Sequence, residues 1–253
     1  MSSWLIGTLV SSKMVAENVK SLTFDVPKWP GHKAGQHCDI RLTSETGYQA
    51  QRSYSIANTP EAGSTKVEFG VQILENGEVS PYLFALAVGD KVEIKGPLGG
   101  HFIWDTTMPG PLVLIAGGSG IVPLMSMLRE HIALETTTLN ATKSHVESSP
   151  RPVRLLISAR TKDKIPYFQE LEYYKERHPN LKIYYTITEN APKSWGGFTR
   201  RVDKAMLAEV TDELLGKMPM IYVCGPTGFV EVVANTLVAI GFNSHEIKTE
   251  RFG

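Results

Sequence analysis

An arginine, a tyrosine and two serines stand close together in the stretch 51–58, Gln-Arg-Ser-Tyr-Ser-Ile-Ala-Asn. The stretch alternates like a β-strand, so Arg52 and Tyr54 should face one side and Ser53 and Ser55 the other. A guanidinium binds phosphate oxygens through two parallel bonds, and a flat aromatic ring stacks on another ring. The segment therefore predicts a site for a ligand with a phosphate next to a ring system. Taken alone, so short a motif leaves an ordinary solvated strand as the alternative.

A second anion-binding element is predicted where Gly77 leads through Val79 and Ser80 toward a short helix near Val79–Leu86. A glycine turn that enters a helix exposes unpaired backbone N–H groups, which attract anions. The alternative is a plain helix start, in which Ser80 caps the helix ahead of Pro81. Two anion-binding elements in one half of the chain favour a dinucleotide ligand.

A Gly-rich turn, Gly117-Gly118-Ser119-Gly120, follows a continuous apolar run and precedes a helical pattern that begins with Ile121 and contains Pro123. A strand that runs into a Gly-rich turn and then a helix places N–H groups at the carboxyl end of a parallel sheet, where open α/β folds bind ligands. The glycines lack the G-x-G-x-x-G spacing, and no Gly-Lys-Ser/Thr follows, so a P-loop is excluded. Proline is tolerated in a first helical turn.

The C-terminal half carries two further motifs. They are Cys224-Gly225-Pro226, at the end of an apolar run, and the tail Glu250-Arg251-Phe252-Gly253. A lone cysteine at the end of a strand is either a small buried residue or a residue placed beside a reacting ligand. A chain end should fray, so an aromatic residue there is unusual.

In this order the four main motifs, at 52–55, 117–120, 224–226 and 250–253, resemble the ferredoxin–NADP reductase superfamily of flavin-dependent oxidoreductases over nearly the whole chain. The resemblance implies that Arg52 holds a flavin phosphate, that Tyr54 packs on the isoalloxazine ring and that Ser55 reaches its N5 edge. The Gly77–Ser80 segment would contact the pyrophosphate, and FAD is accordingly expected rather than FMN.

The resemblance also assigns the turn from Gly117 to Pro123 to the nicotinamide dinucleotide. It places Cys224, with Gly225 and Pro226, beside the nicotinamide C4, where the cysteine is not a nucleophile because hydride transfer needs no covalent step. Phe252 would cover the flavin ring, and Glu250 would assist proton or electron traffic. Here Gly253 extends one residue beyond the aromatic, so the match is close but not identical.

The adenosine end of the nicotinamide site has three candidate arginines. Arg160 follows the second predicted strand of the C-terminal half, and Arg200-Arg201 stands where the family more often has a Gly-Arg pair. An arginine can bind a ribose 2′-phosphate through two bonds, whereas a clear acidic partner for a 2′-hydroxyl is missing at the end of that strand. These residues favour NADPH slightly, and the expected cofactor is written NAD(P)H.

Composition limits the function classes. The 253 residues are 42% hydrophobic and 21% charged, as in a globular protein, and Lys plus Arg balances Asp plus Glu at 26 each. That balance argues against nucleic-acid binding. No apolar run reaches the ~18 residues of a membrane span. The start has no secretory pattern, and Cys38 and Cys224 are too few for a cysteine-ligated iron–sulfur cluster, so we expect a cytoplasmic chain with no metal site.

Two rhythms divide the chain. Short alternating runs up to Trp104 predict an antiparallel six-stranded β-barrel, expected to bind flavin, over residues 1–107. Apolar strands that alternate with helices predict a parallel-sheet α/β domain, expected to bind the nicotinamide cofactor, over 108–253. The polar stretch Thr136–Pro152 is expected to be a long surface loop.

These features together predict a reductase that transfers a hydride from NAD(P)H to bound FAD and passes electrons to a separate acceptor. The acceptor could be a ferredoxin, a Rieske protein, a flavodoxin, a haem or molybdenum enzyme, or a small molecule. Two alternatives remain open, a free flavin reductase and a regulatory flavoprotein subunit. The sequence does not indicate the oligomeric state.

Overall fold

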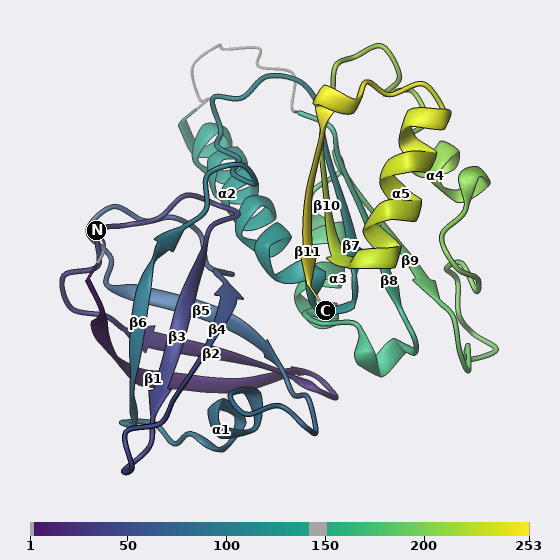
Figure 1. Ribbon diagram of the computed structural model, residues 1–253. Helices are drawn as coiled ribbons and strands as arrows, with labels where there is room; N and C mark the ends of the chain where they lie inside the picture. The colour runs from purple at the N-terminus through teal and green to yellow at the C-terminus, as the bar shows by residue number, and fades with distance from the viewer. Residues whose placement is uncertain (1–2, 142–150, 253) are drawn as a thin grey trace.

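A computed structural model describes residues 3–141 and 151–252, and it forms two units that pack against each other (Figure 1). The N-terminal unit is a sheet of six antiparallel strands. The C-terminal unit is a sheet of five parallel strands with helices on both faces. Both predicted architectures are confirmed.

The strands of the first sheet lie in the order β4-β3-β6-β1-β2-β5. Their bounds are β1 Leu5–Ala16, β2 Val19–Asp25, β3 His37–Thr43, β4 Gln49–Ser55, β5 Lys66–Gln72 and β6 Lys91–Leu98. Alternate side chains point inward, as Leu22 and Phe24 do on β2, and they form a continuous apolar core. Helix α1, Ser80–Ala85, closes one side of this core through Leu83.

Strand β4 lies at an edge of this sheet. It pairs only with β3 among the strands of the described residues, and a single bridge from Ile56 to Phe69 links its end to β5. The sheet therefore closes only partly into a barrel. Backbone groups on the outer edge of β4 remain available to a ligand.

The strands of the second sheet lie in the order β11-β10-β7-β8-β9. Their bounds are β7 Leu112–Gly117, β8 Val153–Ala159, β9 Leu181–Ile187, β10 Met220–Pro226 and β11 Ile247–Phe252. The helices are α2 Ile121–Ala141, α3 Phe168–Arg177, α4 Lys204–Val210 and α5 Thr227–Ala239. On β7, Leu114 packs toward α2 whereas Val113 and Ile115 pack toward α4 and α5, which explains why the strand is apolar throughout.

One segment differs from what the sequence predicts. The loop expected at Thr136–Pro152 is wrong for its first six residues, because α2 continues to Ala141; residues 142–150 lie outside the described part. No glycine or proline interrupts the helix after Pro123, and the Thr136 and Thr137 hydroxyls donate to carbonyls one turn earlier, 2.8 Å away in each case. The tail does not fray, since β11 pairs with β10 up to Phe252.

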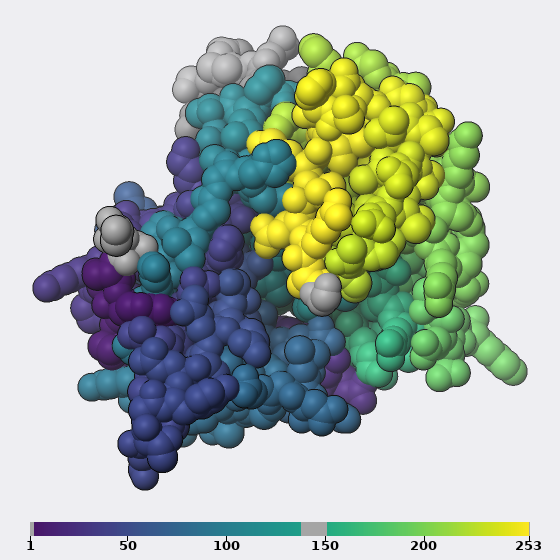
Figure 2. Space-filling model, viewed as in Figure 1, coloured from purple at the N-terminus to yellow at the C-terminus, as the bar shows by residue number. Residues whose placement is uncertain are grey.

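One of the apolar clusters contains residues of both units. Phe102 and Trp104, which follow the barrel strands, pack with buried residues of α2 and β7. Figure 2 shows the C-terminal segments, in yellow, lying against the barrel, in purple and blue. Among the described residues, the helices are all too short or too polar to cross a bilayer.

Candidate functional site

The strand predicted to bind flavin presents the groups that a phosphate and a ring would need. The Arg52 side chain is 58% exposed and contacts the Gln51 carbonyl at 2.7 Å and the Glu78 carboxylate at 3.3 Å. The Tyr54 ring is half-buried against the barrel core, and this burial raises the pKa of its hydroxyl to about 12. An exposed cation and a fixed, neutral aromatic ring thus lie two residues apart on an open edge strand.

The two serines of this strand have different surroundings. The Ser53 hydroxyl donates to Asp39 on the neighbouring strand at 2.6 Å, so it is engaged within the barrel sheet. The Ser55 hydroxyl instead donates to Glu250 of β11 at 3.3 Å. Ser55 therefore connects the barrel to the C-terminal strand across 195 positions of the sequence.

The Gly77–Ser80 segment does begin a helix, but not through a serine cap. Val79 occupies the cap position without a side-chain bond, and Ser80 is the first helical residue, with Pro81 in the first turn. The Ser80 hydroxyl is buried and accepts a bond from the Leu74 backbone N–H at 3.0 Å. The capping role of Ser80 is thus wrong, because the hydroxyl closes the preceding turn. What the segment offers a ligand is its backbone, together with the Arg52–Glu78 pair beside it.

Close approach of two backbones explains the glycines of the second turn. The turn Gly118–Gly120 is one 3₁₀ turn between β7 and α2. A Cβ on Gly120 would lie 2.2 Å from the Cys224 carbonyl oxygen, and one on Gly117 would lie 2.8 Å from the Phe229 ring. Gly118 has a φ of +56° and open space around it, a conformation that only glycine adopts without strain. Ile121 and Pro123 are buried where α2 begins.

Cys224, Gly225 and Pro226 end β10, next to the Gly117 turn at the end of β7. The Cys224 thiol is 2% exposed, and burial together with the nearby Glu250 carboxylate raises its pKa well above the usual range. It therefore stays protonated at neutral pH, in agreement with a packing role and not a nucleophilic one.

Phe229 belongs to this site although sequence reasoning did not select it. A Cβ added to Gly117 or to Gly225 would meet its ring at 2.8 Å in both cases, so the ring covers both turns. No short-range pattern marks it, because Phe229 lies in the first turn of α5 whereas Gly117 and Gly225 belong to strands β7 and β10.

Strand β11 places Glu250 and Phe252 next to the end of β10. Glu250 pairs with Cys224 and Phe252 with Pro226 along the parallel strands. Burial raises the pKa of the Glu250 carboxyl, and the bond from Ser55 lowers it by a smaller amount. The Phe252 side chain is 39% exposed at the end of β11. A buried carboxyl with a raised pKa and an exposed aromatic ring thus lie beside β4, the strand predicted to bind flavin.

The predicted adenosine end lies at the carboxyl ends of β8 and β9. Arg160 is exposed, and its carbonyl accepts from the Glu189 N–H at 2.8 Å. Arg200 is held by Asp203 at 2.5 Å, whereas Arg201 is exposed. Of the two adjacent arginines, Arg201 is therefore the one with a side chain free of this ion pair.

The residues present fit both dinucleotides. The open edge of β4, the exposed guanidinium of Arg52 and the half-buried Tyr54 ring suit a flavin with its phosphates. The glycine turns at the ends of adjacent strands β7 and β10 provide the backbone cradle that a nicotinamide dinucleotide needs at the carboxyl edge of a parallel sheet. The Ser55–Glu250 contact joins the two places.

Comparison with known proteins agrees with this geometry. Residues 7–103 match the family described as Oxidoreductase FAD-binding domain, and residues 114–235 match the family described as Oxidoreductase NAD-binding domain. The chain is 31% identical over 245 residues to NADH-cytochrome b5 reductase 1 of Lodderomyces elongisporus, and the match covers 93% of this chain and 74% of that protein.

Two further relatives extend the comparison. The chain is 28% identical over 240 residues to the phenol 2-monooxygenase reductase component DmpP of Pseudomonas sp. (strain CF600), and the match covers 94% of this chain but only 62% of that protein. The solved structure of a ferredoxin NADP⁺ reductase from Neisseria gonorrhoeae with bound FAD and NADP superposes with a TM-score of 0.79 at 17% identity, over 99% of each chain. The chain belongs to the ferredoxin–NADP reductase superfamily, as an NAD(P)H-dependent flavoprotein reductase with an FAD-binding domain followed by an NAD-binding domain.

Proposed function

We propose that this reductase transfers a hydride from NAD(P)H to bound FAD and passes the electrons to a separate acceptor protein. The Ser55–Glu250 contact carries the first part of the proposal, because it brings β4 to the ends of β10 and β11, next to the glycine turns. Bound FAD would supply a hydride acceptor that can release electrons one or two at a time. The protein supplies the positions of the two ligands and a protonatable group between them.

The roles we propose for individual residues follow from their surroundings. Arg52 binds flavin phosphate, Tyr54 packs on the ring and Ser55 orients the buried carboxyl of Glu250, whose pKa is raised by burial. The backbone of Gly77, Val79 and Ser80 meets the pyrophosphate. On the other side, the nicotinamide dinucleotide would contact the residues of the two turns and two arginines: Gly117, Gly118, Gly120, Ile121, Pro123, Cys224, Gly225, Pro226, Arg160 and Arg201. We place the domain limits at 1–107 and 108–253.

The names of relatives support an acceptor on a separate chain. Those relatives include cytochrome b5 reductases, the reductase component of a phenol monooxygenase and the reductase subunit of a glycine betaine monooxygenase. We propose for this chain the same class of acceptor, a small redox protein with an iron–sulfur, haem or flavin centre, such as a ferredoxin, a Rieske protein or a flavodoxin.

The test is reduction of candidate acceptors by the purified protein. We expect a yellow protein that keeps about one FAD per chain after gel filtration and that NAD(P)H bleaches without oxygen. A partner captured by the reduced protein should then be reduced at a rate that saturates with its concentration. Loss of the flavin on the column would favour a free flavin reductase, and bound flavin that NAD(P)H does not bleach would favour a regulatory subunit.

Replacing Arg52 by alanine should weaken FAD binding. The change removes a charge-assisted phosphate contact of about 1.5–3 kcal/mol, which corresponds to a roughly ten- to hundredfold loss of affinity. Titration of flavin-free protein with FAD measures the dissociation constant. Arg41→Ala is a matched control, because Arg41 lies on neighbouring β3 but pairs with Glu93; equal losses in both variants would contradict the phosphate role.

Arg160→Ala should change the choice between NADPH and NADH. A 2′-phosphate adds negative charge, and an exposed arginine at the end of β8 is suited to bind it. The ratio of kcat/KM for NADPH to kcat/KM for NADH should fall roughly tenfold. Arg201→Ala should act in the same direction, whereas Arg200→Ala, which opens the pair with Asp203, should act less. If all three variants keep the wild-type ratio, the adenosine lies elsewhere.

A further inference from the structure

One face of α2 makes several polar contacts with the flavin-binding domain. Val122, Ser126 and Arg129 follow one another at helical spacing and so lie on that face. A Cβ on Gly70 of β5 would lie 2.4 Å from Val122, and the Ser126 hydroxyl donates to the Asn58 carbonyl at 2.7 Å. The helix therefore lies against β5 and against the residues that follow β4.

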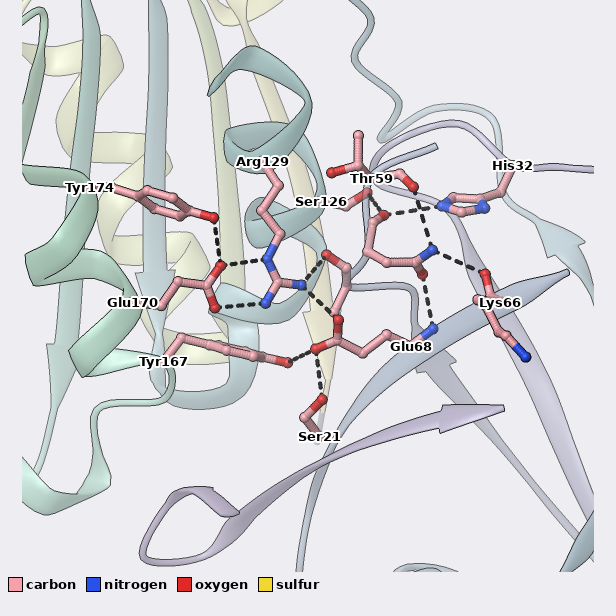
Figure 3. A network of polar contacts seen from close by, with 12 residues as sticks. Ser21, His32, Thr59, Lys66, Glu68, Ser126, Arg129, Tyr167, Glu170 and Tyr174 are labelled. Atoms are coloured by element: carbon pink, nitrogen blue, oxygen red, sulfur yellow. Dashed lines mark hydrogen bonds and ion pairs between the residues drawn. The ribbon is translucent and has the colours of Figure 1, made fainter. Parts of the chain in front are cut away.

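Arg129 is at the centre of this interface (Figure 3). Its guanidinium donates to the Ala57 carbonyl and to Glu68, both at 2.9 Å, and binds Glu170 of α3 through two bonds of 2.7 and 2.8 Å. The side chain is 15% exposed. One residue of the nicotinamide-binding domain thus holds two segments of the flavin-binding domain and a second helix of its own domain.

The partners of Arg129 are fixed in turn. Glu68 accepts from Ser21 at 2.7 Å and from Tyr167 at 3.3 Å, and Glu170 accepts from Tyr174 at 2.9 Å. Burial alone would lower the pKa of Arg129, but the bonds to Glu170 and the charges of both carboxylates raise it, so the side chain stays charged. A buried ion network contributes little net stability, yet its directional bonds define one geometry.

Arg129 holds the segment that directly follows β4 (Gln49–Ser55), the strand proposed to bind flavin and here called the flavin strand. Ala57 donates its N–H to the Glu68 carbonyl at 2.8 Å, and the Glu68 N–H donates to the Asn58 side chain at 2.9 Å. Ala57 lies two residues after Ser55. A shift of Ala57 would therefore move the serine that contacts Glu250.

The same helix carries the turn Gly118–Gly120, proposed to bind the nicotinamide cofactor, at its N-terminal end. Gly118–Gly120 directly precedes Ile121, the first residue of α2, and Arg129 follows eight residues later. A helix is stiff over this span of about 12 Å. Both ligand-binding elements are consequently attached to one rigid segment, the turn covalently and the strand through Arg129.

We propose that Arg129 is a positioning residue that sets the separation between the flavin strand and the nicotinamide turn. The proposal rests on the proposed function. Arg129 contacts neither site directly; it acts through Ala57 and Glu68 on one side and through α2 on the other. Its loss should therefore slow transfer between the two cofactors more than it weakens the binding of either.

The first test measures these effects separately. In Arg129→Met, anaerobic stopped-flow bleaching by NADH should slow about tenfold or more, while the flavin content and the dissociation constant of NAD⁺ change less than about threefold. Arg129→Lys should restore part of the rate, because a lysine can still reach one carboxylate. Arg177→Met is the control, since Arg177 is an exposed residue of α3 that pairs with Glu176.

A second test uses the flavin-free protein, so it does not depend on turnover. Amide hydrogen exchange should increase in Arg129→Met at 56–58 and at 118–122, and not in Arg177→Met. If Arg129→Met does not fold, Ser126→Ala and Glu68→Gln test the same contact between α2 and the flavin-binding domain with smaller changes. In the Arg129→Met, Glu68→Gln pair, the losses of rate should be less than additive.

Three results would overturn the proposal. They are a bleaching rate in Arg129→Met equal to that of the control, a loss of rate explained entirely by weaker FAD or NADH binding, and unchanged exchange at both segments. Wild-type protein that neither NADH nor NADPH bleaches would refute the proposed function and this inference together, whereas normal bleaching in every variant would refute the inference alone.

Discussion

Replacing Gly120 by alanine should abolish tight nicotinamide binding and destabilise the protein by about 2–4 kcal/mol. The added Cβ would lie 2.2 Å from the Cys224 carbonyl oxygen and 2.9 Å from the Gly225 nitrogen. Both contacts are with the backbone of the adjacent strand, so no side chain can rotate away, and the turn must move. Because that turn forms half of the proposed nicotinamide cradle, affinity for NAD(P)H should fall about a hundredfold or more.

Denaturant unfolding and NAD(P)⁺ titration together check this expectation. Gly118→Ala should cost less, about 1–2 kcal/mol, since its φ of +56° is strained for alanine but the space around it is open. Gly100→Ala is the control, because an added Cβ there would meet no atom within 4 Å beyond its chain neighbours, and its φ is not positive. Wild-type stability in Gly120→Ala would show that the two turns approach each other less closely than described.

Local sequence patterns predicted the fold well because the packing of strands and helices favours the same structure as each pattern. Alternation on β2 and β5 indicated inward-facing Leu22 and Phe69, and the continuous apolar run of β7 indicated a strand covered on both faces. The prediction of a loop at Thr136–Ala141 was wrong. The segment is polar, but it contains no glycine or proline that would end the helix. Threonine hydroxyls can bond within a helix, so a polar run need not end one.

The candidate site was predictable only where a motif is local. Gly120 was selected from the Gly-rich turn. Glycine is required there because the Cys224 carbonyl lies close, and this approach depends on pairing between strands about a hundred residues apart. The alternative in which Ser80 caps the helix is wrong, because its hydroxyl accepts from the Leu74 N–H. Arg129 and Phe229 were missed because each acts on residues of another element, and no short-range pattern distinguishes them from ordinary helix residues.

Replacing Phe252 by alanine should tighten NAD(P)⁺ binding roughly tenfold or more and slow turnover by a similar factor. Phe252 ends β11 beside Pro226, two residues after the glutamate that contacts the flavin strand. If its ring covers the flavin, the nicotinamide must displace it, because a planar surface can carry only one ring at van der Waals distance. Without the aromatic, the nicotinamide would meet no competitor and would leave more slowly, so product release would limit turnover.

Three measurements on the same protein distinguish this role from simple packing. Equilibrium titration gives the affinity for NAD(P)⁺, steady-state kinetics gives the turnover, and the flavin spectrum should change because a stacked ring is lost. Arg251→Ala is the control, since that neighbouring side chain pairs with Glu231 on α5 and should alter none of the three. An unchanged spectrum together with unchanged nicotinamide affinity would place Phe252 away from the flavin. A spectrum that changes with no gain in affinity would mean that the ring shields the flavin without competing for the nicotinamide.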